Sequence, residues 1–192
     1  MKKKIVISAN SFWNIYNFRM HLIEFLNKNY EIIILAPFDN YTKRLDNEKY
    51  TLQNIELNPR GKNFVKELFL IIKYYRILKK FNPDYYLGFT IKPNIYGNIV
   101  CYFLGIKSVN TITGLGSVFL NNNLFQKVIK VLYKFSLSFS NKVILQNKFD
   151  RDFLVENKII NKNKIKIING SGIDVTKFEY KNNIFGKNFN FL

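Results

Sequence analysis

The residues best suited to bind a ligand lie in four short stretches, each directly after an apolar run of the chain: 10–17, 90–94, 113–117 and 169–174. They combine amide and hydroxyl side chains, which form hydrogen bonds, with glycines, which let a ligand approach the backbone. No residue is assigned a catalytic role. The candidate binding residues, which include two residues next to the first stretch, are Asn10, Asn14, Asn17, Phe18, Arg19, Thr90, Lys92, Asn94, Thr113, Gly114, Leu115, Gly116, Ser117, Gly170, Ser171, Gly172 and Asp174.

The stretch TITGLGSVF (111–119) places Gly114 and Gly116 at the end of a β-rich run. Glycine permits positive φ and a close approach of a ligand or of another chain segment. The pair is equally typical of an ordinary tight turn. A third glycine of a dinucleotide-binding loop is absent because Phe119 occupies its position, and the loop after the first apolar run has no glycine. The sequence also lacks a Walker A loop.

Arg19 and Lys92 add positive charge to two of these stretches. Each stretch precedes a helical pattern, whose first turn offers free N–H groups and partial positive charge. The pattern therefore predicts that the two cations cradle a diphosphate. The alternative is that both are ordinary solvated surface charges.

The other residues with chemical potential are few. The single histidine, His21, excludes a multi-histidine metal site, and a lone helical histidine is more typical of a structural residue than of a base. The single cysteine, Cys101, excludes an intrachain disulfide and is typical of a small core residue in a reducing compartment. Asp174 is suited either to position a sugar hydroxyl or to cap the turn 175–177.

Strand and helix patterns alternate along the chain. Apolar runs predict strands at 4–9, 30–36, 51–57, 84–89, 108–113, 142–146 and 164–168. Helical periodicity predicts helices at 18–28, with Asn17 as N-cap, and at 62–80, 93–105, 122–140 and 148–157. This alternation predicts an α/β fold, a Rossmann-like parallel sheet with helices on both faces. Ligands of such sheets bind outside the carboxyl ends of the strands, where the four stretches would meet.

The formal net charge of +17 favours an anionic partner, although the Lys- and Asn-rich composition is also typical of an AT-rich genome. Helices 123–140 and 64–80 carry lysines among large apolar residues, which suits either an anionic membrane surface or a core helix with a wet face. The first apolar run is too short for a signal peptide, and charges interrupt 64–81. We therefore expect a cytoplasmic protein, peripheral on the inner face of the membrane.

Four segments resemble the N-terminal half of family 4 glycosyltransferases of the GT-B fold: NIYNFRMHLI (14–23), FTIKPNIYGNIVCYFLGI (89–106), TITGLGSVF (111–119) and INGSGIDVTKFE (168–179). The resemblance is strongest to bacterial enzymes that extend glycans on undecaprenyl diphosphate for capsule, lipopolysaccharide or glycoprotein synthesis. It implies an acceptor-binding domain at 1–178, followed at 179–192 by a linker and the start of a missing donor-binding domain. It also implies a retaining, metal-independent transfer that needs no cofactor, with a UDP-sugar as donor and a lipid-linked glycan as acceptor.

By position, the resemblance implies that residues 14–19 approach the donor phosphates or the acceptor, and that Lys92 and Asn94 face the acceptor head group. It places 114–117 on the cleft floor and 170–174 before the domain hinge. The resemblance places the family's E-x7-E carboxylate pair and the basic residues that bind the donor in the missing C-terminal domain, so this chain alone is expected to be inactive. An alternative is a non-catalytic subunit that partners a separate donor-binding polypeptide. Nucleic acid is not expected as a partner because no nucleic-acid-binding motif is recognisable.

Overall fold

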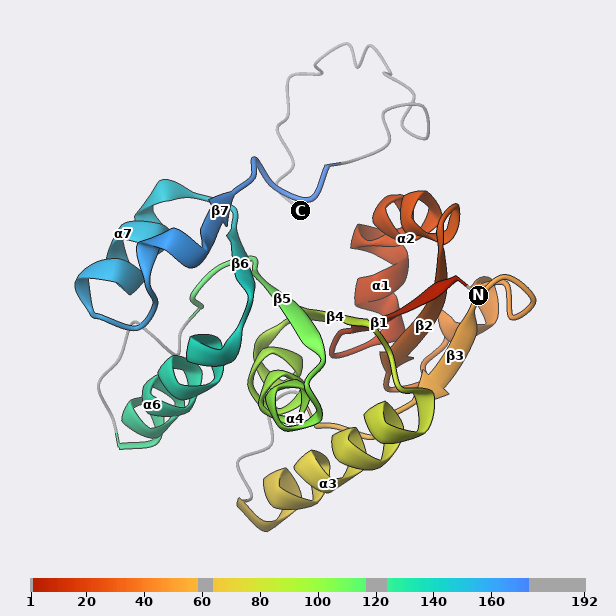
Figure 1. Ribbon diagram of the computed structural model, residues 1–192, viewed down its shortest axis with the longest axis horizontal. Helices are drawn as coiled ribbons and strands as arrows, with labels where there is room; N and C mark the ends of the chain where they lie inside the picture. Colours follow the sequence, from red (N-terminus) through yellow and green to blue (C-terminus); the bar gives the residue numbers. More distant parts are fainter. Residues whose placement is uncertain (1, 59–63, 117–123, 173–192) are drawn as a thin grey trace, which may run out of the picture.

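The computed structural model in Figure 1 describes residues 2–58, 64–116 and 124–172. Within these ranges seven strands form one sheet in the order β3-β2-β1-β4-β5-β6-β7, and all neighbouring strands are parallel. The predicted α/β fold with a Rossmann-like parallel sheet is therefore confirmed. The strands are β1 (Lys3–Ser8), β2 (Tyr30–Ala36), β3 (Thr51–Asn54), β4 (Tyr85–Phe89), β5 (Lys107–Ile112), β6 (Lys142–Leu145) and β7 (Ile165–Ile167).

The central strands are apolar on both faces because both faces are covered. In β1, Val6 belongs to the larger core cluster, whereas Ile5 and Ile7 belong to the smaller one on the opposite face. The same alternation continues in β2, where Ile33 and Ile34 lie in different clusters. Continuous Ile and Val runs are thus what a doubly covered parallel sheet requires.

Helices occupy both faces, as predicted (Figure 1). Helices α1 (Phe12–Phe18) and α2 (Met20–Asn27) pack on the smaller cluster. The larger cluster is covered by α3 (Phe64–Phe81), the π-helical segment η2 (Pro93–Gly97), α4 (Asn98–Leu104), α6 (Leu124–Phe139) and α7 (Lys148–Glu156). Short 3-10 turns are η1 (Thr42–Arg44) and η3 (Lys162–Lys164). In the described ranges, no helix has both the length and the apolar composition needed to cross a bilayer.

The segment after β1 differs from its prediction. Residues 10–17 were expected to be a loop with Asn17 as N-cap of the next helix, but α1 begins at Phe12 with Ser11 as its N-cap. The Ser11 hydroxyl accepts a hydrogen bond from the Asn14 N–H at 3.1 Å, while Asn17 lies inside the helix and donates to the Trp13 carbonyl. Burial of Phe12 and Ile15 explains why this short, Asn-containing segment is helical.

The helix after β4 begins with a widened π-helical turn that is fixed by a buried tyrosine. Tyr86 on β4 donates its hydroxyl hydrogen to the Pro93 carbonyl at 3.0 Å. A Cβ added to Gly97 would lie 2.0 Å from this hydroxyl oxygen, so packing requires a glycine at that position. The contact fixes the start of the helix relative to the carboxyl end of β4.

Buried amides then tie this helix to its neighbours. Asn98 donates to the Ser136 carbonyl at 2.6 Å and to the Ser140 hydroxyl at 3.0 Å, and Asn110 donates to the same Ser140 hydroxyl at 2.6 Å. These hydrogen bonds join α4, α6 and β5 in the core.

Candidate functional site

The strand order creates a switch point at β1 and β4. The chain runs from β1 outward through β2 to β3, then crosses back to β4 and continues outward to β7. In an open parallel sheet of this kind, a crevice forms outside the carboxyl ends of the two strands at which the direction reverses. The four predicted stretches follow β1, β4, β5 and β7, so the topology brings them to this one edge.

Arg19, between α1 and α2, is the most unusual residue at this edge. It is only 5% exposed, and its guanidinium carbon lies 4.3 Å from the centroid of the Phe89 ring at the end of β4. Its Nη1 donates a hydrogen bond to the Ser171 hydroxyl at 2.6 Å. No carboxylate of the described residues forms an ion pair with it. The prediction of an ordinary solvated charge is therefore wrong for Arg19.

Burial lowers the pKa of Arg19 from 12.5 to about 10, because the charged form loses hydration. The side chain thus remains a cation at neutral pH. A buried charge is costly unless an opposite charge compensates it. An anionic ligand, held by the planar guanidinium, would supply that compensation.

Ser171 connects this arginine to the far strands of the sheet. Its hydroxyl oxygen also accepts a hydrogen bond from Gln146 at 3.0 Å, directly after β6. The flanking Gly170 and Gly172 adopt φ of 79° and 74°, which glycine tolerates without strain. Gln146 was not among the predicted site residues, although the rule that selected the other strand ends applies to it as well.

Backbone strain marks the end of β4. Thr90 has a φ of 69°, which is an outlier for a β-branched residue. The Asn94 N–H donates to its carbonyl at 3.1 Å and so holds the turn closed. Strained residues of this kind cluster at binding and active sites.

Seven buried side-chain polar atoms have no hydrogen-bond partner in the described structure, and four of them lie in the segments that follow β1 and β4: Asn14 Oδ1, Arg19 Nε, Thr90 Oγ1 and Asn94 Oδ1. The other three lie on α3, α4 and β5. Native proteins satisfy the large majority of buried polar side-chain atoms. The presence of four such atoms in the segments after β1 and β4 is what a ligand-binding edge would show without its ligand.

Lys92 and Asn94 lie differently from their predicted roles. Lys92 is not solvated but forms a largely buried ion pair with Glu67 of α3. Asn94 is fully buried and donates to the Thr111 carbonyl at 2.9 Å, so its side chain does not face a ligand, contrary to the prediction. Of the two cations that were predicted to cradle a diphosphate, only Arg19 remains a candidate, because Lys92 pairs with Glu67.

The remaining predicted residues line the edge in different ways. Asn10 is half-buried, Asn17, Phe18, Thr113, Gly114 and Gly116 are exposed, and Leu115 is buried in the larger core cluster. Positive φ explains Gly116, whereas a Cβ on Gly114 would meet no described atom within 4 Å. His21 is exposed on α2, 4.0 Å from Glu24. Ser117 and Asp174 lie outside the described residues.

Fold and edge together define a class, a doubly wound α/β domain with a buried arginine at its switch point. The family described as Glycosyl transferase 4-like matches residues 4–147, and the chain belongs to that family. This confirms the predicted glycosyltransferase family at the level of the domain. No curated protein sequence matches the chain.

Solved structures share this fold. A glycosyltransferase from Rickettsia africae aligns with a TM-score of 0.63 and 20% identity over 87% of this chain and 42% of its own. Anabaena HepE, solved in complex with UDP and glucose, aligns with a TM-score of 0.67 and 14% identity over 94% of this chain and 47% of its own. The UDP-GlcNAc 2-epimerase from Methanocaldococcus jannaschii aligns with a TM-score of 0.60 and 21% identity over 87% of this chain and 45% of its own. The chain therefore spans less than half the length of these structures.

Proposed function

We propose that this chain is the acceptor-binding domain of a glycosyltransferase that moves a sugar from a UDP-sugar to a lipid-linked glycan on undecaprenyl diphosphate. The observation that carries the proposal is Arg19, a buried cation that pairs with no carboxylate of the described residues, at the switch point of a glycosyltransferase-family domain. The sequence of the chain also resembles transferases such as the N-acetylgalactosaminyltransferase that acts on diacetylbacillosaminyl-diphospho-undecaprenol. Capsule, lipopolysaccharide or glycoprotein glycan synthesis would use this reaction.

The proposed role of Arg19 is to bind a diphosphate. Nη1 donates to the Ser171 hydroxyl, while the buried Nε has no hydrogen-bond partner among the described residues, so a ligand oxygen that reached it would satisfy this donor. An arginine pairs well with phosphate oxygens because its donors form a rigid planar fork. The diphosphate belongs either to the donor nucleotide or to the lipid acceptor. Family resemblance supports a retaining, metal-independent transfer in which the departing diphosphate takes the acceptor proton.

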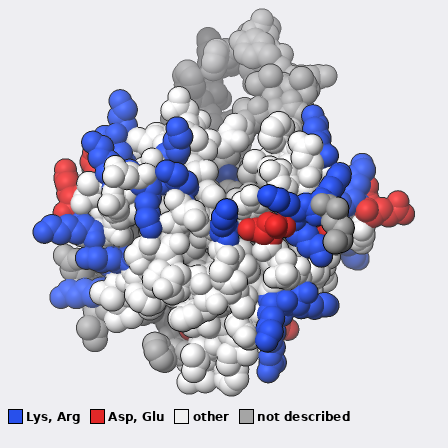
Figure 2. All heavy atoms as spheres, in the orientation of Figure 1, with Lys and Arg blue, Asp and Glu red and all other residues white. Residues whose placement is uncertain are grey.

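Membrane contact is proposed through the helices on the larger core. On α3 the exposed apolar side chains outside any pocket lining recur at helical spacing, and they are Val65, Leu68, Ile72 and Tyr75. The residues that flank them include Arg76, Lys79 and Lys80. Tyr102 and Phe103 of α4 are also exposed. In Figure 2 the middle of this face is largely free of charge, with Lys and Arg gathered on both sides of it. Each basic residue near an anionic bilayer contributes about 1 kcal/mol, which supports a peripheral position on the inner face of the cytoplasmic membrane.

A two-arm binding experiment tests this function. The first arm is flotation with vesicles that contain polyprenyl diphosphate, compared with phosphatidylglycerol vesicles of equal negative charge. The second arm is calorimetry with a soluble UDP-sugar. Wild-type chain should prefer the polyprenyl diphosphate vesicles, and Arg19→Met should lose that preference while Arg151→Met, which removes an arginine on α7, retains it.

Each result has one meaning. Arg19-dependent binding to the UDP-sugar alone would assign the diphosphate to the donor and contradict the acceptor role. Equal flotation with both kinds of vesicle, together with no binding of the UDP-sugar, would contradict the proposed diphosphate site altogether.

A further inference from the structure

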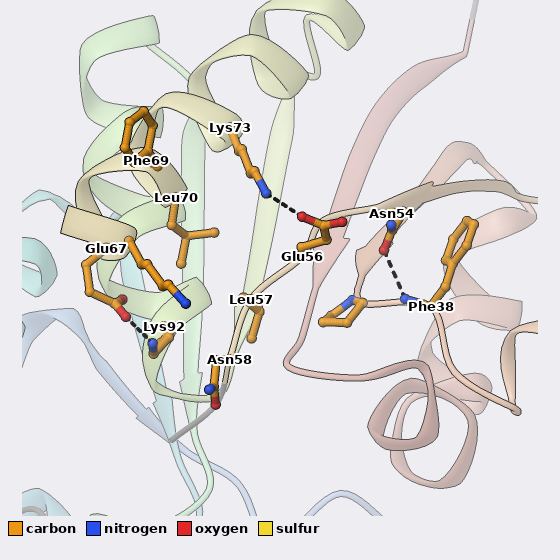
Figure 3. Close-up of a pocket in the computed structure, with 12 residues that line it drawn as sticks. Phe38, Asn54, Glu56, Leu57, Asn58, Glu67, Phe69, Leu70, Lys73 and Lys92 are labelled. Carbon is orange, nitrogen blue, oxygen red and sulfur yellow. Dashed lines mark hydrogen bonds and ion pairs between the residues drawn. The ribbon is translucent and has the colours of Figure 1, made fainter. Parts of the chain in front are cut away.

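A hollow lies along the same edge of the sheet, at the ends of β2 and β3 (Figure 3). Its volume is about 700 Å³, within the range of small-molecule sites. The lining comes from the end of β3, from the residues after β2 and β3, from α3 and from Lys92 before the helix that follows β4.

Two lysine–glutamate ion pairs lie in this pocket, and Lys66 adds a third ammonium group to its lining. Lys73 donates to Glu56 at 2.8 Å on the open side, and the Lys92–Glu67 pair lies deeper. Figure 3 shows both pairs as dashed lines, with Phe69 and Phe38 on opposite sides of them. The lining thus presents cationic donors directly beside carboxylate acceptors.

The two ion pairs favour an uncharged ligand. A phosphate beside them would be repelled by Glu56 and Glu67 and would have to displace these carboxylates from Lys73 and Lys92. Neighbouring hydroxyl groups, in contrast, both donate and accept hydrogen bonds, so they match an adjacent ammonium and carboxylate without breaking the ion pairs. The amide side chains of Asn54 and Asn58 provide further groups of the same kind.

The apolar part of the lining fits the same chemistry. Phe38 and Phe69 are 52% and 59% exposed, so their rings are accessible to a ligand in the pocket. An aromatic ring offers a flat apolar face. The C–H faces of a pyranose ring are apolar while its edge carries hydroxyl groups, so one sugar can use both parts of the lining.

We infer that this pocket binds a neutral sugar residue of the acceptor glycan. The inference rests on the proposed function, and it adds the position of the glycan to that of the diphosphate. The two sites share one segment, because Phe89 lies under Arg19 and Lys92 lines the pocket three residues later. A glycan in the pocket would therefore extend along the sheet edge toward the switch point.

Saturation-transfer NMR on the full chain tests this inference. The probes are the methyl glycosides of glucose, galactose, N-acetylglucosamine and N-acetylgalactosamine. At least one should receive saturation from the wild-type chain. Glu56→Ala should weaken its binding about tenfold, through loss of a charged hydrogen-bond acceptor, and Phe69→Ala about fivefold. Both residues are exposed, so neither change should affect folding.

Matched controls separate this pocket from the Arg19 site. Glu48→Ala and Phe149→Ala remove an exposed carboxylate and an exposed aromatic ring that do not line the pocket, and should leave glycoside binding unchanged. Arg19→Met should also leave it unchanged, even where it abolishes diphosphate binding. Three results would each overturn the inference. None of the four glycosides receives saturation from the wild-type chain, or both Glu56→Ala and Phe69→Ala bind the glycoside as well as the wild-type chain does, or inorganic pyrophosphate displaces the glycoside.

Discussion

Replacing Arg19 by methionine separates a ligand-binding arginine from a structural one. Methionine keeps an unbranched apolar side chain against Phe89 but removes the buried charge. The pKa of Arg19 is lowered from 12.5 to about 10, which corresponds to a cost of about 3 kcal/mol for holding the cation in the folded chain. Arg19→Met removes this cost.

The same change also removes favourable contacts. The charge-assisted hydrogen bond to Ser171 is worth about 1.5–3 kcal/mol, and the contact with the Phe89 ring about 0.5–2 kcal/mol. Ser171 is exposed and can turn to water, so no buried partner is left unsatisfied. The contacts removed are worth about 2–5 kcal/mol in total and the cost removed is about 3 kcal/mol, so we expect the free energy of unfolding to lie between about 1 kcal/mol above and about 2 kcal/mol below the wild-type value.

Urea denaturation at neutral pH measures this quantity, with the slope m confirming that both chains unfold in the same way. Calorimetric titration with inorganic pyrophosphate measures the binding function in parallel. We expect binding to fall by about tenfold or more in Arg19→Met and to persist in Arg151→Met. A loss of 3 kcal/mol or more in stability, or unchanged pyrophosphate binding, would refute the reasoning and make Arg19 a structural residue.

Three further predictions concern the scaffold of the site. Gly97→Ala places a Cβ against the Tyr86 hydroxyl and should lower the free energy of unfolding by about 2–3 kcal/mol, measured by urea denaturation. Gly114→Ala, the control, should change it by less than about 0.5 kcal/mol, and equal values for the two variants would contradict the close packing at Gly97. Thr90→Gly relieves a positive φ and should raise the free energy of unfolding by about 1 kcal/mol, so a destabilised variant would mean that the Thr90 side chain supports the turn. Burial raises the pKa of the Cys101 thiol well above its usual range, so a thiol reagent at pH 8 should label it only after unfolding in urea; rapid labelling of the folded chain would contradict its burial.

The strands were predictable because their apolar runs are continuous. The run YEIIILA was expected at 30–36, and β2 has these bounds. Strand 51–57 was drawn too long, since β3 ends at Asn54. Its alternating, partly polar sequence carries no clear stop signal. The order of the strands came from the structure, but the rule that ligands of a parallel sheet bind outside the carboxyl ends of its strands located the candidate edge before any side chain was placed.

Local helix geometry was harder to predict, because tertiary packing determines it. Helix α1 has aromatic and Asn residues with modest helix propensity, and it is stabilised by burial of Phe12 and Ile15. The π-helical turn at 93–97 depends on Tyr86, which lies on the preceding strand. Neither contact is visible in the periodicity of the segment itself.

The site residues were likewise only partly predictable. The topology predicted which loops carry them, but it did not predict which of their side chains face a ligand. Arg19 meets Ser171 across 152 residues of sequence, and Lys92 meets Glu67 on a different helix. Long-range partners of this kind determine whether a basic residue is free to bind an anion, and spacing within one segment does not reveal them.

The central position of β1 also affects how the chain is made. Its residue Ile5 pairs with Tyr85 of β4, which the ribosome adds 80 residues later. At a synthesis rate of about 5–20 residues per second, one edge of this apolar strand therefore stays unpaired for roughly 4–16 s. An unpaired edge of this type invites pairing between nascent chains, and the charged Lys3 and Lys4 at its start oppose that. Translation through α3 is therefore the period in which the newborn chain is most exposed to aggregation.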